Sequence, residues 1–174
     1  MSMSKTWRVV YRLWPLGRSR DRIGAAGLGS LGGMAMASEK IRLGVIGANI
    51  SVGWAHRSHL PALLASPEFE LTAVCTTKRE SSEESAAKYG ARMAFHDHNE
   101  MLASPEIDAV AVVVRVPNHY ELTKDVLNAG KHVYTEWPLG ATLDEAKELA
   151  ALARSKGLQA MVGLQARAAP AMLY

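Results

Sequence analysis

Residues 107–135 read IDAVAVVVRVPNHYELTKDVLNAGKHVYT. The first part, residues 107–114, is apolar and β-branched on both faces, which is typical of a central strand in a parallel sheet. Residues 118–129 predict a helix that Gly130 closes, and residues 131–135 predict another strand. A strand, a helix and a strand in this order predict a right-handed crossover between parallel strands.

The same alternation extends from residue 41 to about residue 165. The apolar runs predict strands at residues 41–46, 70–75, 93–95, 107–114, 131–135 and 159–163. The amphipathic segments predict helices at residues 54–65, 80–89, 118–129 and 142–156, with a short helix through Ala103 that Asp97 caps. Alternating strands and helices predict an α/β fold with a doubly wound parallel sheet.

Two of these helices carry more specific expectations. In the helix at residues 54–65, Leu60, Leu63 and Leu64 are expected to share the buried face. In the helix at residues 142–156, Thr142 followed three residues later by Glu145 predicts a capping box.

The composition indicates one globular domain, and the excess positive charge lies in the first forty residues of the chain. The chain has 174 residues, 48% of them hydrophobic, and a formal net charge of +3. The basic residues of this segment, opposed only by Asp21 and Glu39, are Lys5, Arg8, Arg12, Arg18, Arg20, Arg22 and Lys40. Because acids and bases roughly balance from Ile41 onward, we expect no direct nucleic-acid partner for the folded domain.

The single cysteine, Cys75, excludes an internal disulfide, and no apolar run is long enough to predict a membrane-spanning helix. A reducing, cytoplasmic location is the simplest expectation, with no membrane partner. Cys75 itself is expected to pack within its strand rather than to react.

Residues 1–38 are expected to form an extension to the fold, with the nucleotide-binding domain at 39–165 and the start of another domain at 166–174. The extension is Arg-rich and then Gly-rich. Three interpretations stay open: an export signal with Ala35-Met36-Ala37 as cleavage site, an organellar transit peptide, or a natural start at Met34 or Met36. Under any of them, residues 1–33 are expected to be dispensable for folding.

The loop after the first strand, GANISVGW at residues 47–54, is the first candidate ligand site. In an open parallel sheet, ligands bind at the carboxyl ends of the strands. Gly47 allows a sharp turn, and the backbone N–H groups near Asn49, Ile50 and Ser51 are expected to face a pyrophosphate. The loop departs from G-x-G-x-x-G, since Asn49 replaces the second glycine, so a plain strand–helix turn is the alternative.

The loop after the second strand bears on the choice of cofactor. An NAD site usually places Asp or Glu here to bind the ribose 2′-OH. This chain has Thr76, Thr77, Lys78 and Arg79 instead, and hydroxyls and cations suit a 2′-phosphate. NADP is therefore expected rather than NAD. The alternative is that the two cations simply begin a solvated helix.

Two further stretches carry a family resemblance: IRLGVIG at residues 41–47 and NAGKHVYTEWP at residues 128–138. With them, residues 41–174 resemble the N-terminal domain of the Gfo/Idh/MocA (glucose–fructose oxidoreductase / inositol dehydrogenase) family. VPNHYE, EWPLG and LQARAAP look most like the branch that contains a fungal galactose-pathway repressor, which binds NADP without dehydrogenase chemistry. The resemblance implies a Rossmann-like domain, a second α/β domain missing from these residues, a sugar or polyol substrate and a homo-oligomer.

The resemblance also implies roles for individual residues. Glu136 would reach the ribose region of the cofactor, and Pro138 would shape the turn after it, in some relatives through a cis peptide bond. Trp137 stands where the family has an acid–base lysine; an indole has no titratable proton near neutral pH, so no catalytic residue is assigned. The other expected cofactor contacts are Val116, Pro117, His119 and Gln165.

Some expectations keep a structural alternative beside the functional one. His119 either lines the site or simply begins a helix, and Gln165 with Arg167 either reaches the ligand or forms a linker. His96 and His98 around Asp97 are not expected to converge on a metal, and His59 is expected to be an ordinary helix residue. Trp54 either covers the first loop or packs on the sheet.

Two functions stay open. One is hydride transfer between NADP and a sugar or polyol, in which these 174 residues are inactive by themselves. The other is a non-catalytic NADP-binding transcriptional regulator that acts through protein contacts.

Overall fold

The computed structural model describes residues 40–164, which form a single parallel sheet with helices on both faces. The expectations for the N-terminal extension, and those for Gln165 and Arg167, lie outside these residues. No helix within the described range is both long and apolar enough to cross a membrane.

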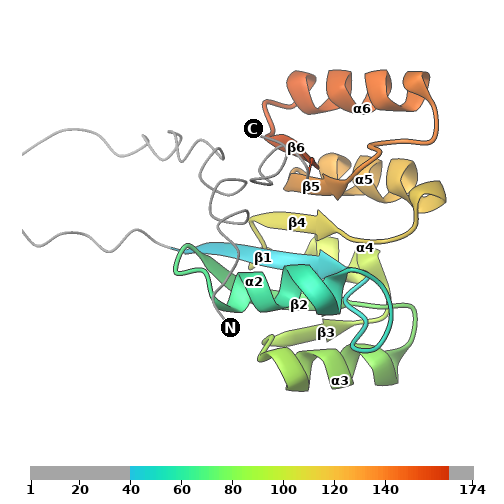
Figure 1. Ribbon diagram of the computed structural model, residues 1–174. Helices are drawn as coiled ribbons and strands as arrows, with labels where there is room; N and C mark the ends of the chain where they lie inside the picture. The colour runs from blue at the N-terminus through green and yellow to red at the C-terminus, as the bar shows by residue number, and fades with distance from the viewer. Residues whose placement is uncertain (1–39, 165–174) are drawn as a thin grey trace, which may run out of the picture.

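The sheet has six strands in the order β3-β2-β1-β4-β5-β6, and every neighbouring pair is parallel. Figure 1 shows this order, with β3 at one edge and β6 at the other. The strands are β1 (Ile41–Ile46), β2 (Phe69–Cys75), β3 (Met93–Phe95), β4 (Ala109–Val112), β5 (His132–Glu136) and β6 (Ala160–Gly163). The expected doubly wound parallel sheet is confirmed.

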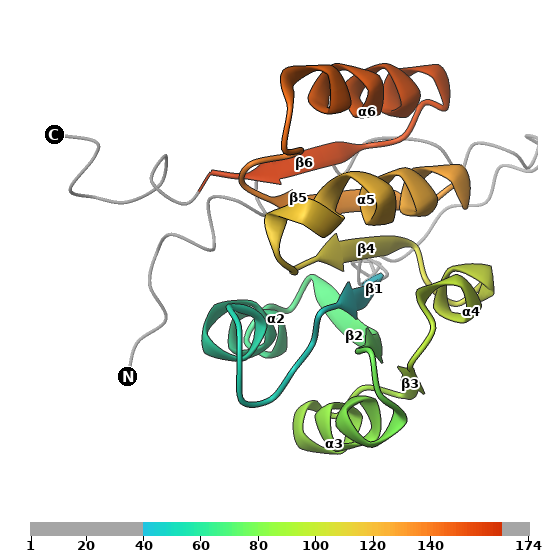
Figure 2. The same cartoon turned by 90° about the vertical axis from the view of Figure 1, so that its right-hand side faces the viewer.

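The crossovers between the strands are helical. In chain order they are a π-helical turn, η1 (Ala55–His59), then α2 (Leu60–Leu64), α3 (Arg79–Tyr89), α4 (His98–Ala103), a 3-10 turn, η2 (Val116–Asn118), α5 (His119–Asn128) and α6 (Leu143–Ser155). Figure 2 shows α2 and α4 on opposite sides of the sheet.

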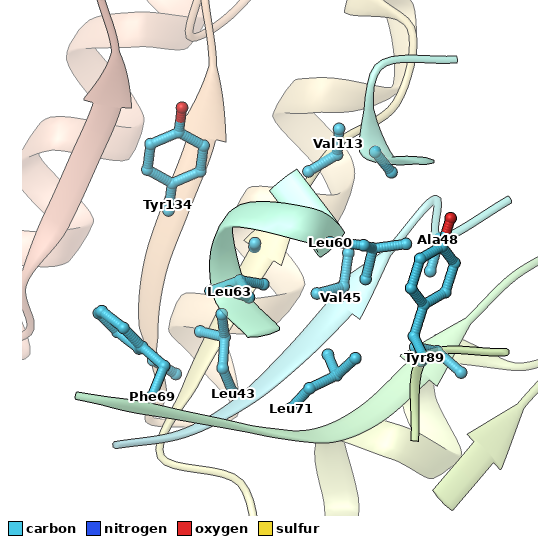
Figure 3. Close-up of a cluster of buried hydrophobic side chains, with 14 residues drawn as sticks. Leu43, Val45, Ala48, Leu60, Leu63, Phe69, Leu71, Tyr89, Val113 and Tyr134 are labelled. Atoms are coloured by element: carbon cyan, nitrogen blue, oxygen red, sulfur yellow. The ribbon is translucent and has the colours of Figure 1, made fainter. Parts of the chain in front are cut away.

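Two apolar cores separate these layers. On one face, Leu60 and Leu63 of α2 pack against Val45 of β1 and Leu71 of β2, as Figure 3 shows. On the other face, residues of α4, α5 and α6 pack against β2, β4 and β5, with Val110 fully buried at the centre. Covering both faces explains why β4 is apolar at every position.

The expected helix boundaries follow from local capping. Asp97 accepts a hydrogen bond from the backbone N–H of Asn99 at 2.8 Å and begins α4. Thr142 and Glu145 form the expected capping box at the start of α6. Gly90, with φ of 72°, ends α3 in the left-handed conformation that glycine adopts without steric cost.

One expectation about the first crossover is wrong. Leu64 is 55% exposed, whereas His59 is fully buried with Leu60 and Leu63. Residues four apart lie on the same helix face, so His59 shares the buried face with Leu63, while Leu64 lies about 100° further round the helix.

Candidate functional site

The carboxyl ends of all six strands meet at one edge of the sheet, because the strands are parallel. The loop after β1 and the loop after β4 both emerge at this edge, where the arrowheads of Figure 1 point. The expected cofactor residues that the structure describes all end or follow a strand at this edge: Gly47, Asn49, Ile50, Ser51, Thr76, Thr77, Lys78, Arg79, Val116, Pro117, His119, Glu136, Trp137 and Pro138.

Gly47 turns the chain out of β1 in a conformation and a space that only glycine fits. Its φ is 87°, and its backbone N–H donates to the Cys75 carbonyl at 2.9 Å. A Cβ at this position would lie 2.1 Å from the carbonyl oxygen of Val113. The turn therefore brings the backbone after β1 close to the backbone after β4, as a Rossmann-type phosphate loop requires.

Asn49 organises the rest of this loop with its side chain. Its Oδ1 accepts hydrogen bonds from the backbone N–H of Ser51 at 2.9 Å, from the Ser51 hydroxyl at 3.0 Å and from the backbone N–H of Val52 at 3.1 Å. Lys88 Nζ of α3 lies 3.5 Å from the Ile50 carbonyl oxygen. The Asn49 carboxamide therefore accepts hydrogen bonds from backbone N–H groups of the loop. With a glycine at this position, those N–H groups would need a ligand or water as acceptor.

The loop after β2 presents hydroxyls and cations and no acid. Thr76 Oγ1 lies 2.5 Å from Ser81 Oγ and donates to the Lys78 carbonyl at 2.9 Å, which fixes the start of α3. The side chains of Thr77, Lys78 and Arg79 are exposed there. Their position at a strand end and a helix N-terminus suits an anionic ligand.

Cys75, the last residue of β2, is buried beneath this loop. Burial raises the pKa of its thiol to about 12, and the charges of Asp97 and Glu100 add to the rise. Because the thiolate is the reactive form, the expectation of a packed and unreactive strand residue fits this environment.

His119 joins two of the strand-end loops. Its side chain is 1% exposed, with Nδ1 2.6 Å from the Pro138 carbonyl oxygen and Nε2 3.0 Å from the Val114 carbonyl oxygen. The residue begins α5, directly after the η2 turn that contains Val116 and Pro117. A buried ring between two carbonyl groups fixes the loop after β4 against the loop after β5.

Glu136, the last residue of β5, contacts polar side chains from two elements at this edge. The Tyr134 hydroxyl donates to its Oε1 at 2.9 Å, and His59 Nε2 lies 2.7 Å from the same oxygen. By itself, burial would raise the pKa of the Glu136 carboxyl. The hydrogen bond and charge of His59, the Tyr134 hydroxyl and the charge of His119 outweigh burial and hold the pKa below its usual value.

Trp137 follows Glu136 and faces solvent. The indole is 66% exposed. The Trp137–Pro138 peptide bond is cis, which is the geometry that the family resemblance implies for some relatives. The structure thus presents a large apolar side chain, and no ammonium group, at this point of the edge.

His59 is the residue that the sequence interpretation missed. It is expected from the sequence only as an ordinary helix residue; its spacing of four from Leu63 is a signal for the buried face, but nothing in the local sequence reveals its contact with Glu136 on β5. The histidines around Asp97 behave differently. His98 Nε2 lies 3.0 Å from Asp125 Oδ2, and within residues 40–164 no group of three or more His, Cys, Asp or Glu could hold a metal ion.

The chain is similar to known proteins over the described range. The family described as "Oxidoreductase family, NAD-binding Rossmann fold" matches residues 41–164. Dehydrogenase aclE of Aspergillus oryzae is 34% identical over 78% of this chain and 39% of that protein. The galactose/lactose metabolism regulatory protein of Saccharomyces cerevisiae is 32% identical over 76% of this chain and 33% of that protein.

A solved structure shows the same arrangement. The 3-ketoreductase of Actinomadura kijaniata, in complex with NADP, superposes with a TM-score of 0.72 and 32% identity over 76% of this chain and 41% of that one. The chain therefore spans between a third and about two fifths of the length of these relatives. It belongs to the Gfo/Idh/MocA oxidoreductase family, and residues 41–164 are its NAD(P)-binding Rossmann domain.

Proposed function

We propose that this domain binds NADP(H) in preference to NAD(H). The observation that carries the proposal is the end of β2, where Thr77, Lys78 and Arg79 are exposed beside the carboxyl edge. Residues 76–79 contain no carboxylate to bind a ribose 2′-OH, while their two cations and a hydroxyl can bind a 2′-phosphate.

The remaining residues of the edge fit a dinucleotide. The close approach of the Gly47 turn to Val113 leaves backbone groups, rather than side chains, at the position of a pyrophosphate. Asn49, Ile50 and Ser51 would lie along the phosphates, Glu136 would reach a ribose, and Val116, Pro117 and Pro138 would border the nicotinamide half. Bound there, the cofactor would supply hydride transfer, and the protein would supply binding and orientation.

For the complete protein we propose oxidoreduction of a CH–OH group on a sugar or polyol. Support comes from the family and from relatives that are a dehydrogenase and a 3-ketoreductase. Within the chain, residues 39–165 form the cofactor domain in this proposal and 166–174 begin the next one. The substrate would bind between this domain and the remainder of the protein, so these 174 residues alone are expected to be inactive.

A specific observation favours a second function, that of a non-catalytic NADP-binding regulator. Trp137 puts an exposed indole where the family resemblance implies an acid–base lysine. The similarity to the yeast galactose regulator points in the same direction. In this alternative the cofactor site is kept and proton transfer is lost.

Calorimetric titration with NADPH and with NADH tests the cofactor proposal. We expect tighter binding of NADPH, and tighter binding of NADH would contradict it. NADPH-coupled turnover of the complete protein with aldoses, polyols and inositols separates the two functions. Turnover supports the oxidoreductase, and cofactor binding without turnover of any of them supports the regulator.

A further inference from the structure

His59 brings a fully buried imidazole against the carboxyl end of β5. Its side chain is 0% exposed, and its Nε2 lies 2.7 Å from Oε1 of Glu136, whose side chain is 12% exposed. Removing such a pair from water is costly, so a buried ion pair is weak evidence for stabilisation of the fold. The pair is better explained by the geometry that it imposes on Glu136.

Tyr134 on β5 provides a hydrogen-bond donor to the oxygen that His59 contacts. Its hydroxyl donates to Glu136 Oε1 at 2.9 Å. The rings of Tyr134 and His59 pack edge to face, with centroids 5.5 Å apart and an interplanar angle of 65°. The His59 imidazole from η1, as an ion-pair partner, and the Tyr134 hydroxyl from β5, as a hydrogen-bond donor, converge on Oε1 and restrict the rotation of the carboxylate.

Gly163 on the neighbouring strand leaves the space that this cluster occupies. It pairs with Glu136 in the register of β5 and β6. A Cβ at Gly163 would lie 2.2 Å from the Tyr134 hydroxyl oxygen and 3.1 Å from Glu136 Oε1. The glycine on β6 therefore leaves room for the contact between Tyr134 and Glu136, which a side chain at this position would obstruct.

The groups that face Glu136 also decide its charge. Burial raises the pKa of the carboxyl, and it is opposed by His59 from η1, by Tyr134 from its own strand and by His119 from α5. Gly163 from β6 contributes no ionisable group. The balance keeps the carboxyl ionised, and His59 makes the largest opposing contribution.

We propose that His59 is a positioning residue, which holds the Glu136 carboxylate as an anion of fixed orientation for hydrogen bonding to the cofactor ribose. This inference rests on the proposed cofactor site, because it assigns Glu136 a contact with the dinucleotide. The role of His59 is indirect, since it acts on the cofactor only through Glu136. Tyr134, on the same strand as Glu136, helps to hold the carboxylate.

The first test needs no cofactor and follows the Glu136 carboxyl by carbon-13 NMR as a function of pH. The resonance is identified by its loss in Glu136→Gln. We expect it to titrate below the usual glutamate range in the unmodified chain and at clearly higher pH in His59→Leu, where the largest contribution that opposes burial is lost. An unchanged titration in a folded His59→Leu chain would overturn the inference.

The second test measures NADPH affinity across the range from about pH 6 to about pH 8.5, where an elevated carboxyl pKa would show. In His59→Leu we expect affinity at the acidic end to fall by about tenfold relative to the unmodified chain, the effect of losing one hydrogen bond to a charged group. The deficit should shrink as pH rises and the carboxyl ionises. His59→Gln, which keeps a donor, should recover most of the affinity.

Control variants separate the possible failures. His98→Leu removes a different histidine–carboxylate pair and should change neither the Glu136 titration nor NADPH affinity. If His59→Leu does not fold, His59→Gln removes the charge and keeps a polar group; the Glu136 carboxyl should still titrate at higher pH than in the unmodified chain, and an unchanged titration in that variant would equally overturn the inference. If the unmodified chain binds no NADPH, the proposed function fails, while the carbon-13 titration still decides whether His59 holds the carboxylate.

Discussion

Gly47 lies directly against the backbone of Val113, so that a side chain on the first would collide with the carbonyl oxygen of the second at 2.1 Å. Two loops from neighbouring strands, β1 and β4, are thereby brought into contact at the carboxyl edge. In the proposed cofactor site, this close approach would let backbone, rather than side-chain, atoms face a phosphate.

We expect Gly47→Ala to destabilise the fold much more than Gly53→Ala. Both glycines have φ of 87°, but a Cβ at Gly53 would meet nothing within 4 Å. Gly53→Ala should therefore cost only the left-handed backbone penalty, about 1–2 kcal/mol. Gly47→Ala adds a collision with backbone that cannot move aside, for a total of about 4 kcal/mol or more. Urea unfolding of the two variants measures the difference, and equal losses would show that the Val113 contact is not restrictive.

Cys75 should be protected from thiol reagents in the folded chain. Its pKa is raised from 9.0 to about 12, chiefly by burial, so almost no thiolate is present near neutral pH. We expect iodoacetamide to modify the unfolded chain at about pH 8 and to leave the folded chain largely unmodified. Modification of the folded chain at the rate of a free thiol would contradict the buried environment.

The same shift predicts a loss of stability in alkali. A thiol whose pKa is higher in the folded chain than in the unfolded chain stabilises the fold while it stays protonated. This contribution is complete below the model-compound value of 9.0 and disappears as pH rises toward about 12. Unfolding free energies measured across this range should fall more steeply for the unmodified chain than for Cys75→Ala; parallel curves would count against the shift.

Removal of the two cations at the start of α3 should reduce the preference for NADPH. In a Lys78→Ala, Arg79→Ala double variant, we expect NADPH affinity to fall by about 10–100-fold per hydrogen bond lost to the phosphate, with little change for NADH. Lys147→Ala with Lys156→Ala removes the same charge from exposed positions at α6 and should leave both affinities unchanged. Equal losses for NADPH and NADH in the first variant would mean that the cations do not contact the 2′-phosphate.

Trp137 should limit catalysis even when the complete protein is present. Loss of one positioned proton-transfer group costs about 10²–10⁴ in rate, so Trp137→Lys in the complete protein should raise turnover of a sugar or polyol.

The 174 residues alone should be inactive with either side chain, because failure to orient a substrate forfeits on the order of 7–11 kcal/mol in favourable cases. The assay follows NADPH absorbance. Turnover by the 174 residues alone would contradict this expectation, and full activity of the complete protein without a lysine would show that Trp137 is no obstacle.

The sequence predicted the fold well because its signals are local. The apolar run that ends at Gly47 defines β1, and the pairing of Thr142 with Glu145 defines the start of α6. Fully apolar strands and regular crossovers then leave few arrangements other than a doubly wound sheet.

The candidate site was less predictable because its contacts join distant parts of the chain. His59 meets Glu136 only once the first crossover packs on β5, and a helical pattern shows that a residue is buried without showing its partner. Asn49 was visible as a departure from the glycine motif, but its hydrogen bonds to Ser51 and Val52 depend on the three-dimensional turn. The expected face of three leucines is wrong at Leu64, because the buried face of this crossover consists of His59, Leu60 and Leu63.

The most direct test of the cofactor site is the backbone amide NMR spectrum of the chain as NADPH is added. We predict saturable changes concentrated at the carboxyl ends of β1, β2, β4 and β5, at residues 47–54, 76–79, 116–119 and 136–138, with the amino ends of the strands unaffected. A folded chain that shows no saturable change, or changes only at the opposite edge of the sheet, would contradict the account.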